Sequence, residues 1–156
     1  MKGKIVVAFA SKSGATEEAA SLIAKTLREN DLDVDLVNLR KDKKFRASEY
    51  DNVVVGGAVR GGKIYGEVEK FFRENNLSKK KAALFIVSGG GGDPKQHDDV
   101  LEKYNGKITK QFSDVDFVSN VAFGGRMKIF GKTVFDNRNP EKVKKWAEEL
   151  SVRLKK

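Results

Sequence analysis

The sequence predicts an α/β fold in which helices cover both faces of a parallel β-sheet. Short apolar runs alternate along the whole chain with segments whose apolar residues recur at helical spacing. Parallel strands need long crossover connections, and this alternation supplies them. No repeat, linker or low-complexity boundary interrupts the pattern, so we expect one domain over residues 1–156.

Five apolar runs have the length of strands, and helical segments separate most of them. The expected strands lie near residues 4–9, 34–37, 53–57, 82–87 and 115–123. Helices are expected near 15–29, across 68–72, from Asp93-Pro94 onward and from Asn139-Pro140 onward. Residues 40–49 are so highly charged that only a short or degenerate helix fits there.

Three loops at the carboxyl ends of expected strands contain Gly: 10–16, 58–63 and 88–93. In a doubly wound sheet, ligands bind at these ends, where the strand order reverses. The three loops converge if the five strands adopt the order 2-1-3-4-5. The sequence therefore predicts a ligand site built from these loops.

The first loop has the composition of a phosphate-binding loop. A buried strand ends near Ala10, and Ser11, Ser13, Gly14 and Thr16 lead into a helix. The first N–H groups of a helix lack intrahelical partners, and the helix dipole favours an anion there. Hydroxyls add donors, and glycine lets the backbone approach closely. The alternative is a strand-to-helix turn whose Ser and Thr only cap the helix. Neither the P-loop spacing nor the Gly-x-Gly-x-x-Gly pattern occurs in this turn.

The charge balance indicates an anionic partner. The formal net charge is +9 and the sequence pI is about 9.6, with dense basic runs at 40–44 and 79–81. Such a chain attracts acidic proteins, nucleic acid, anionic lipid headgroups and acidic small molecules, although basic runs also serve simply as solvated surface. No interleaved aromatic and basic pattern favours nucleic acid. The sequence contains no cysteine and no apolar run long enough to span a membrane, which is compatible with a cytoplasmic location.

The pattern Ser11-x-Ser13-Gly14-x-Thr16 after a first strand resembles the FMN phosphate loop of the flavodoxin family. Residues 50–56, Tyr-Asp-Asn-Val-Val-Val-Gly, are similar to the third strand of that family. The resemblance covers nearly the whole chain. It implies a flavodoxin-like, three-layer, doubly wound, five-stranded parallel sheet in the order 2-1-3-4-5, with FMN as the cofactor.

The resemblance also implies three groups of FMN-binding residues. Hydroxyl and backbone N–H groups of the first group would bind the phosphate: Ser11, Lys12, Ser13, Gly14, Ala15 and Thr16. The second group would border the isoalloxazine ring: Ala58, Val59, Arg60 and Gly61. The third would offer backbone N–H groups to the pyrimidine edge of the ring: Ser88, Gly89, Gly90 and Gly91. The alternative for these glycines is a flexible loop without a ligand.

Two short stretches are similar to the menaquinone-dependent protoporphyrinogen oxidases, a flavodoxin-like branch. They are Gly-Ala-Val-Arg-Gly-Gly at 57–62 and Val-Ala-Phe-Gly-Gly-Arg at 121–126. The basic insertion of these oxidases is mostly missing, and only residues 127–137 could replace it. The chain also lacks the loop aromatics that flavodoxins stack on the flavin. Tyr65 or Phe130 could cover the ring instead, and the alternative for each is a packing role.

Several cations are expected near the mouth of the site. Arg60, Lys63 and Arg126 would stabilise an anionic, reduced flavin and raise its two-electron potential if they face the ring. If they point to bulk water, screening makes their effect small. The one histidine, His97, either packs at a helix edge or donates a proton near the third loop.

These observations leave three functions open. The first is an FMN-binding redox protein that exchanges electrons with a redox partner protein or a small anionic substrate. The second is the oxidation of a porphyrinogen-like substrate, whose carboxylates would suit a basic rim. The third is an anion-binding module of flavodoxin-like fold that has lost the flavin.

Overall fold

The computed structural model describes residues 3–12 and 14–156. Its parallel strands follow the order β2-β1-β3-β5-β6, which confirms the order 2-1-3-4-5 expected from the sequence. These strands are β1 (Lys4–Ala10), β2 (Asp33–Asn38), β3 (Asn52–Arg60), β5 (Lys81–Val87) and β6 (Asp116–Phe123). The order reverses between β1 and β3, so the loops after these two strands lie at the edge where ligands bind in such sheets.

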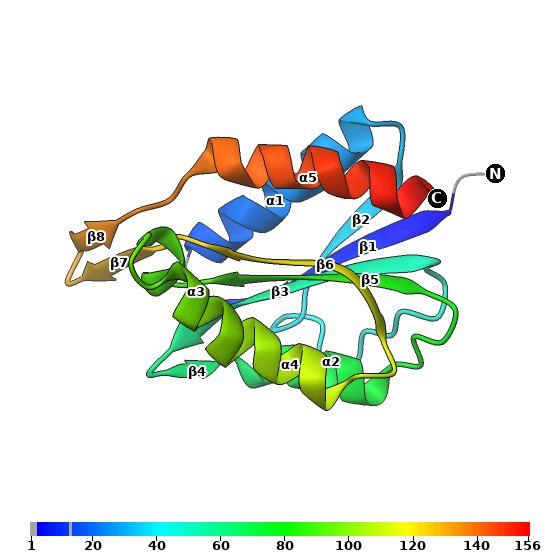
Figure 1. Cartoon of the computed structure of the whole chain (residues 1–156), viewed down its shortest axis with the longest axis horizontal. Helices are drawn as coiled ribbons and strands as arrows, with labels where there is room; N and C mark the ends of the chain where they lie inside the picture. Colours follow the sequence, from blue (N-terminus) through cyan, green and yellow to red (C-terminus); the bar gives the residue numbers. More distant parts are fainter. Residues whose placement is uncertain (1–2, 13) are drawn as a thin grey trace.

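Helices form a layer on each face of the sheet (Figure 1). One layer holds α1 (Gly14–Glu29) and α5 (Pro140–Lys155). The other holds α2 (Gly66–Glu74) and a continuous run of α3 (His97–Val100), the π-helical turn η2 (Leu101–Asn105) and α4 (Gly106–Gln111). Among the described residues, no helix is both long and apolar enough to cross a bilayer. The expected three-layer α/β architecture is confirmed.

Strand β1 illustrates why both layers are needed. Every residue from position 5 to position 10 is buried. Ile5, Val7 and Phe9 pack into the core under α1 and α5. Val6, Ala8 and Ala10 pack into the core on the opposite face. A strand that is apolar on both sides can bury all its side chains only in a sheet covered on both faces.

Helix α5 begins where the sequence predicts. Asn139 is its N-cap, with the side-chain oxygen accepting a hydrogen bond from the Lys142 N–H at 3.2 Å, and Pro140 follows at the first helical position. Trp146 is buried, packs edge-on against Phe123 at 5.7 Å between ring centroids, and donates its Nε1–H to Ser119 Oγ at 3.0 Å. These contacts fix α5 on β6 and hold the intervening segment at the carboxyl end of the sheet.

The structure corrects two helix predictions. Residues 40–49 form turns without a helix. The helix expected from Asp93-Pro94 begins only at His97. Asp93 stabilises a turn instead, because its carboxylate accepts hydrogen bonds from the Lys95 N–H at 2.9 Å and from the Gln96 side chain at 3.0 Å.

Two antiparallel hairpins that the sequence did not predict lie at the carboxyl end of the sheet. In the first, β4 (Lys63–Ile64) pairs with the end of β3 around Gly61 and Gly62, which have φ of 58° and 77°. In the second, β7 (Arg126–Ile129) pairs with β8 (Lys132–Asp136). Figure 1 shows both hairpins at the end of the molecule opposite the chain termini.

Tyr50 joins the segment before β3 to strand β2. Its hydroxyl donates a 2.7 Å hydrogen bond to Asp35 Oδ2. Burial, together with this bond, raises the pKa of Tyr50 to about 12, and the bond lowers the pKa of Asp35. Replacing Tyr50 by phenylalanine should therefore cost about 1 kcal/mol of unfolding free energy near neutral pH.

The shifted pKa values of Asp35 and Tyr50 set the pH range in which the Tyr50–Asp35 hydrogen bond stabilises the fold. Asp35 has a lowered folded pKa, so its contribution is present above its ordinary value of 3.8 and is lost as the pH falls through the folded value. Tyr50 has a raised folded pKa, so its contribution is present below 10.0 and is lost as the pH rises toward about 12. Urea unfolding of wild type and Tyr50→Phe across pH should show a difference that shrinks at both extremes. Tyr104→Phe is the control, and an equal loss in that variant would contradict the assignment.

Candidate functional site

A cavity of about 410 Å³ lies at the carboxyl ends of the strands. It receives residues from the loop after β1, the β3–β4 hairpin, the loop after β5 and the β7–β8 hairpin. Its lining consists of Lys12, Ala15, Ala58, Val59, Arg60, Tyr65, Val87, Ser88, Gly89, Gly125, Arg126, Met127, Lys128, Ile129 and Phe135. The three loops that the sequence singled out therefore meet at one cavity.

The first loop ends at the N-terminus of α1, beside this cavity. Thr16 is fully buried, and its hydroxyl is one of two buried side-chain polar atoms that lack a hydrogen-bond partner in the described part of the chain. A buried hydroxyl without a partner is costly, and natural structures rarely leave one without a reason. Ser11 is also buried, whereas Lys12 is exposed; of the described first-loop residues, Lys12 and Ala15 line the cavity. Ser13, also expected to bind phosphate, lies outside the described residues.

Arg126 reaches the same helix end from the β7–β8 hairpin. Its Nη2 atom lies 3.0 Å from the position that a Cβ on Gly14 would occupy, so glycine leaves room for the guanidinium. The nearest carboxylate is that of Glu18, 3.9 Å from Nη2, and the Arg126 side chain is 20% exposed. A cation and the positive end of a helix dipole thus lie together, an arrangement that favours an anion between or beside them.

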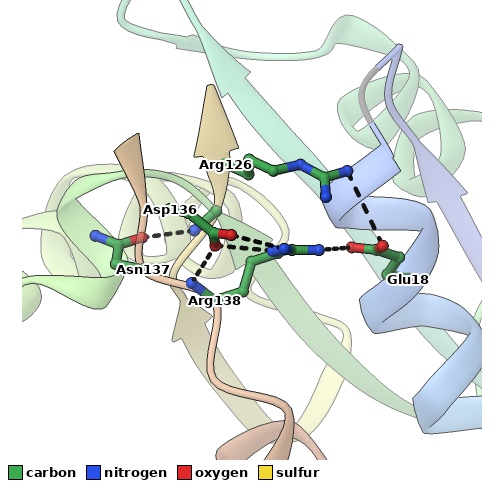
Figure 2. Close-up of polar contacts among 6 residues, drawn as sticks. Glu18, Arg126, Asp136, Asn137 and Arg138 are labelled. Atoms are coloured by element: carbon green, nitrogen blue, oxygen red, sulfur yellow. Dashed lines mark hydrogen bonds and ion pairs between the residues drawn. The ribbon is translucent and has the colours of Figure 1, made fainter. Parts of the chain in front are cut away.

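A network of ion pairs holds the base of the hairpin on α1 (Figure 2). Arg138 contacts Glu18 at 2.6 Å and Asp136 at 2.6 Å. Hydrogen bonds from the Arg138 side chain and backbone lower the pKa of Asp136 to about 2, and the two carboxylates raise the pKa of Arg138. Asp136 therefore remains charged across the physiological pH range, and the network positions the hairpin that carries Arg126.

Asn137 connects the hairpin base to the third loop. Its Oδ1 accepts a hydrogen bond from the Gly125 N–H at 2.9 Å, and its Nδ2 donates to the Gly89 carbonyl at 2.7 Å. Figure 2 shows Asn137 beside the Asp136–Arg138 pair. One amide side chain therefore fixes two segments that line the cavity.

The second loop supplies the expected wall residues. Ala58, Val59 and Arg60 line the cavity, whereas Gly61 forms the hairpin turn beyond it. Tyr65 also lines the cavity, and its ring lies under the Arg40 guanidinium at 4.8 Å.

In the third loop only the first half faces the cavity. Ser88 and Gly89 line it, whereas Gly90 and Gly91 belong to the short 3₁₀ turn η1 (Gly90–Gly92). Gly91 is buried, and its N–H donates to the Ser88 carbonyl at 3.2 Å and to Ser88 Oγ at 3.0 Å. In this conformation the Gly91 N–H is directed into its own loop.

The β7–β8 hairpin contributes to the cavity wall in a way that the sequence did not predict. Met127, Ile129 and Phe135 line it, and a Cβ on Gly89 would lie 2.9 Å from the Phe135 ring. Phe130, one of the two candidates for covering the ring, is fully exposed and does not line the cavity. A two-residue hairpin turn at Phe130-Gly131 was the available signal, but such turns are recognised by Asn-Gly or Asp-Gly.

His97 lies outside this cavity, at the start of α3. Its Nε2 is 3.3 Å from Lys142 Nζ, which also donates to the Ala122 carbonyl at 3.1 Å. Burial lowers the pKa of the Lys142 ammonium. The pair connects α3 to α5 behind the third loop, which agrees with a packing role for His97.

Comparisons with known proteins agree with the observed fold. The family model described as "Flavodoxin domain" matches residues 6–148. Over 72 residues the chain is 28% identical to the Escherichia coli (strain K12) protein named protoporphyrinogen IX dehydrogenase [quinone], which covers 46% of this chain and 40% of that protein. Over 72 residues it is 38% identical to "Probable flavodoxin 1" of Bacillus subtilis (strain 168), covering 46% of each. The matches therefore span less than half the length of these relatives.

Solved flavodoxin structures share the fold. The flavodoxin of Streptococcus pneumonia TIGR4 superposes with a TM-score of 0.66 at 22% identity, covering 96% of this chain and 99% of that one. The flavodoxin of Megasphaera elsdenii superposes with a TM-score of 0.65 at 17% identity, covering 95% and 98%. At these identities the likeness extends to the fold alone.

Proposed function

Because the chain belongs to the flavodoxin family, whose cofactor is FMN, we propose that it holds FMN in the cavity described above and exchanges electrons with a redox partner. The observation that carries this proposal is the buried, unpartnered hydroxyl of Thr16 at the N-terminus of α1. This hydroxyl can donate a hydrogen bond to a ligand. It lies at the helix end where the N–H groups of α1 and Arg126 also favour an anion.

The phosphate end of the site fits a dianion. Thr16 would donate its hydroxyl, and the N–H groups at the start of α1 would donate beside it. Arg126 Nη2 lies close to Gly14, so a modest change of rotamer would let it contact the same phosphate. Its present ion pair with Glu18, at 3.9 Å, is too long to hold it firmly.

The other end of the cavity fits a flat ring. The walls are largely apolar, with Val59, Met127 and Ile129 among the lining residues, and the aromatic side chains of Tyr65 and Phe135 stand in for the missing loop aromatics. Apolar walls exclude water and favour a large conjugated ring. When bound, FMN supplies the redox chemistry, and the protein sets its orientation and electrostatic surroundings.

Positive charge around the mouth supports an anionic partner. Lys12, Arg60 and Lys128 line the cavity as Arg126 does. Cations close to the ring favour its reduced, negatively charged form, so we expect a higher two-electron potential than an acidic flavodoxin has. The same charges would attract an acidic redox protein or a small polyanion.

A second candidate is the oxidation of a porphyrinogen-like molecule by a quinone. The similarity to the Escherichia coli dehydrogenase favours it, and the β7–β8 hairpin occupies the position expected for the insertion of that branch. Turnover of a porphyrinogen with a quinone, measured on the FMN-loaded protein, would distinguish this enzyme from an electron carrier. A chain that takes up no FMN would instead support the anion-binding module without flavin.

Replacing Arg126 by glutamine tests the phosphate end directly. FMN affinity, measured by quenching of flavin fluorescence, should fall about tenfold because one charge-assisted hydrogen bond to the phosphate is lost. Riboflavin, which has the ring but no phosphate, should bind both proteins equally. Arg73→Gln removes the same charge from the exposed face of α2 and is the control. An equal loss for FMN and riboflavin would place Arg126 at the ring instead.

A further inference from the structure

The β7–β8 hairpin carries an unusual share of the exposed apolar surface. Of the six large apolar side chains that are exposed among the described residues, four belong to this hairpin: Met127, Ile129, Phe130 and Val134. Phe130 is 101% exposed at the tip, and Ile129 beside it is 50% exposed. Figure 1 shows the hairpin projecting beyond the body of the molecule. Large apolar side chains exposed together on one hairpin point to an interaction site.

The conformation of the tip gives no reason for a phenylalanine there. Phe130 and Gly131 have φ of 50° and 79°, as the two central residues of a type I′ hairpin turn require. Such turns favour Asn-Gly, and a bulky side chain at positive φ is uncommon and strained. Phe130 therefore stabilises neither the turn nor the core, which points to a role outside the chain.

Basic side chains surround this apolar tip. Lys128 and Lys132 flank the turn on its two strands and are exposed. Arg60 and Lys63 close the neighbouring β3–β4 hairpin, and Lys12 lies at the mouth of the same cavity. The sequence has no acidic residue in 58–66 or in 126–135. This end of the molecule is thus apolar at its most projecting point and positively charged around it.

We propose that the β7–β8 hairpin docks the protein on an anionic lipid bilayer, with Phe130 and Ile129 in the interfacial layer and Lys128 and Lys132 at the headgroups. The projecting, convex shape of the hairpin tip favours a bilayer over a protein partner. A protein would have to offer a matching pocket for the projecting tip, whereas a bilayer admits it without a complementary shape. Aromatic side chains partition to the interface, and each nearby lysine gains electrostatic attraction to anionic lipids.

The docked orientation turns the cavity toward the bilayer. Met127, Lys128 and Ile129 both line the cavity and belong to the hairpin. A molecule dissolved in the lipid would therefore reach the cavity without crossing bulk water. Docking involves only the hairpin surface and does not depend on FMN being bound.

Flotation of the full chain with lipid vesicles tests the docking. Vesicles of mixed phosphatidylglycerol and phosphatidylcholine should carry the protein at low salt, and vesicles of phosphatidylcholine alone should not. Phe130→Asn is the decisive variant, because Asn-Gly is the preferred dipeptide for this turn and should preserve the hairpin. We expect its partition to anionic vesicles to fall about tenfold or more. The double variant Lys128→Gln, Lys132→Gln should fall about thirtyfold, from roughly 1 kcal/mol per lysine.

Two control variants match these changes on helix α5, far from the hairpin. Val152→Gln removes an exposed apolar side chain, and Lys144→Gln with Lys145→Gln removes two exposed charges. Both should bind anionic vesicles as wild type does. Absence of vesicle binding by the wild type at low salt would overturn the proposal, and so would unchanged binding by Phe130→Asn. If the wild type self-associates in sedimentation velocity and Phe130→Asn abolishes this association, the occupant of the hairpin surface is a second copy of the chain, and the bilayer proposal is overturned.

Discussion

Replacing Thr16 by valine should weaken FMN binding about ten- to hundredfold and should leave the folded chain without FMN as stable as wild type or more stable. The side chains of threonine and valine have nearly the same shape, so the substitution removes one hydroxyl without opening a cavity. That hydroxyl is fully buried and has no hydrogen-bond partner in the described structure. Losing a donor to a phosphate costs about 1.5–3 kcal/mol of binding. Removing an unsatisfied buried hydroxyl from the free protein relieves a cost instead.

Thr26→Val is the matched control on the same helix. Thr26 is also buried, but its hydroxyl donates to the Leu22 carbonyl at 2.8 Å within α1. Its replacement should leave FMN affinity unchanged and lower the stability slightly, the opposite pattern to Thr16→Val. Affinity comes from fluorescence titration with FMN, and stability from urea unfolding without FMN. Wild-type affinity in Thr16→Val would remove the main support for phosphate binding at this helix end.

Replacing Gly56 by alanine should destabilise the fold by about 2–3 kcal/mol. Gly56 lies in the central strand β3, paired with Phe9 of β1 and Phe85 of β5. A Cβ at this position would lie closer than 3.0 Å to three atoms of the Phe85 ring, which is fully buried. Forcing an extra carbon into a close-packed core costs about 1–3 kcal/mol. Since domains are stable by only about 5–15 kcal/mol, the loss should be obvious in the denaturation midpoint.

Gly66→Ala is the control for this substitution. A Cβ on Gly66 meets no atom within 4 Å, and the residue begins helix α2, where alanine is tolerated at least as well as glycine. Its urea midpoint should stay at or slightly above that of wild type. Equal midpoints for Gly56→Ala and Gly66→Ala would show that the Phe85 ring can move aside.

The main sheet and the start of α5 could be predicted because their signals are local. The run that forms β1 is apolar at every position, which only a doubly covered strand explains. Asn139-Pro140 specifies a helix start in two adjacent residues, and the structure places α5 there. Asp93-Pro94 carries the same kind of signal but was misread, because the Asp93 carboxylate bonds within a turn before the helix begins.

The hairpin side of the site could not be predicted, because it depends on contacts distant in sequence. Arg138 pairs with Glu18 across 120 positions, and Asn137 reaches Gly89 across 48. Pattern analysis also assumes that apolar residues are buried, whereas Ile129, Phe130 and Val134 are exposed. The mixture of apolar residues and lysines in this segment is only a weak indication of strands. The dipeptide Phe-Gly is not a typical hairpin turn, so the turn between the strands is not recognised either.

Asn137 would link the redox state of a bound flavin to docking on a bilayer. Because this one amide bonds to both Gly125 and Gly89, it joins the hairpin mechanically to the third loop, which lines the cavity. If adsorption of the tip alters that loop, the midpoint potential shifts on adsorption. By reciprocity, gaining electrons would then change the residence of the protein on the surface by the same factor.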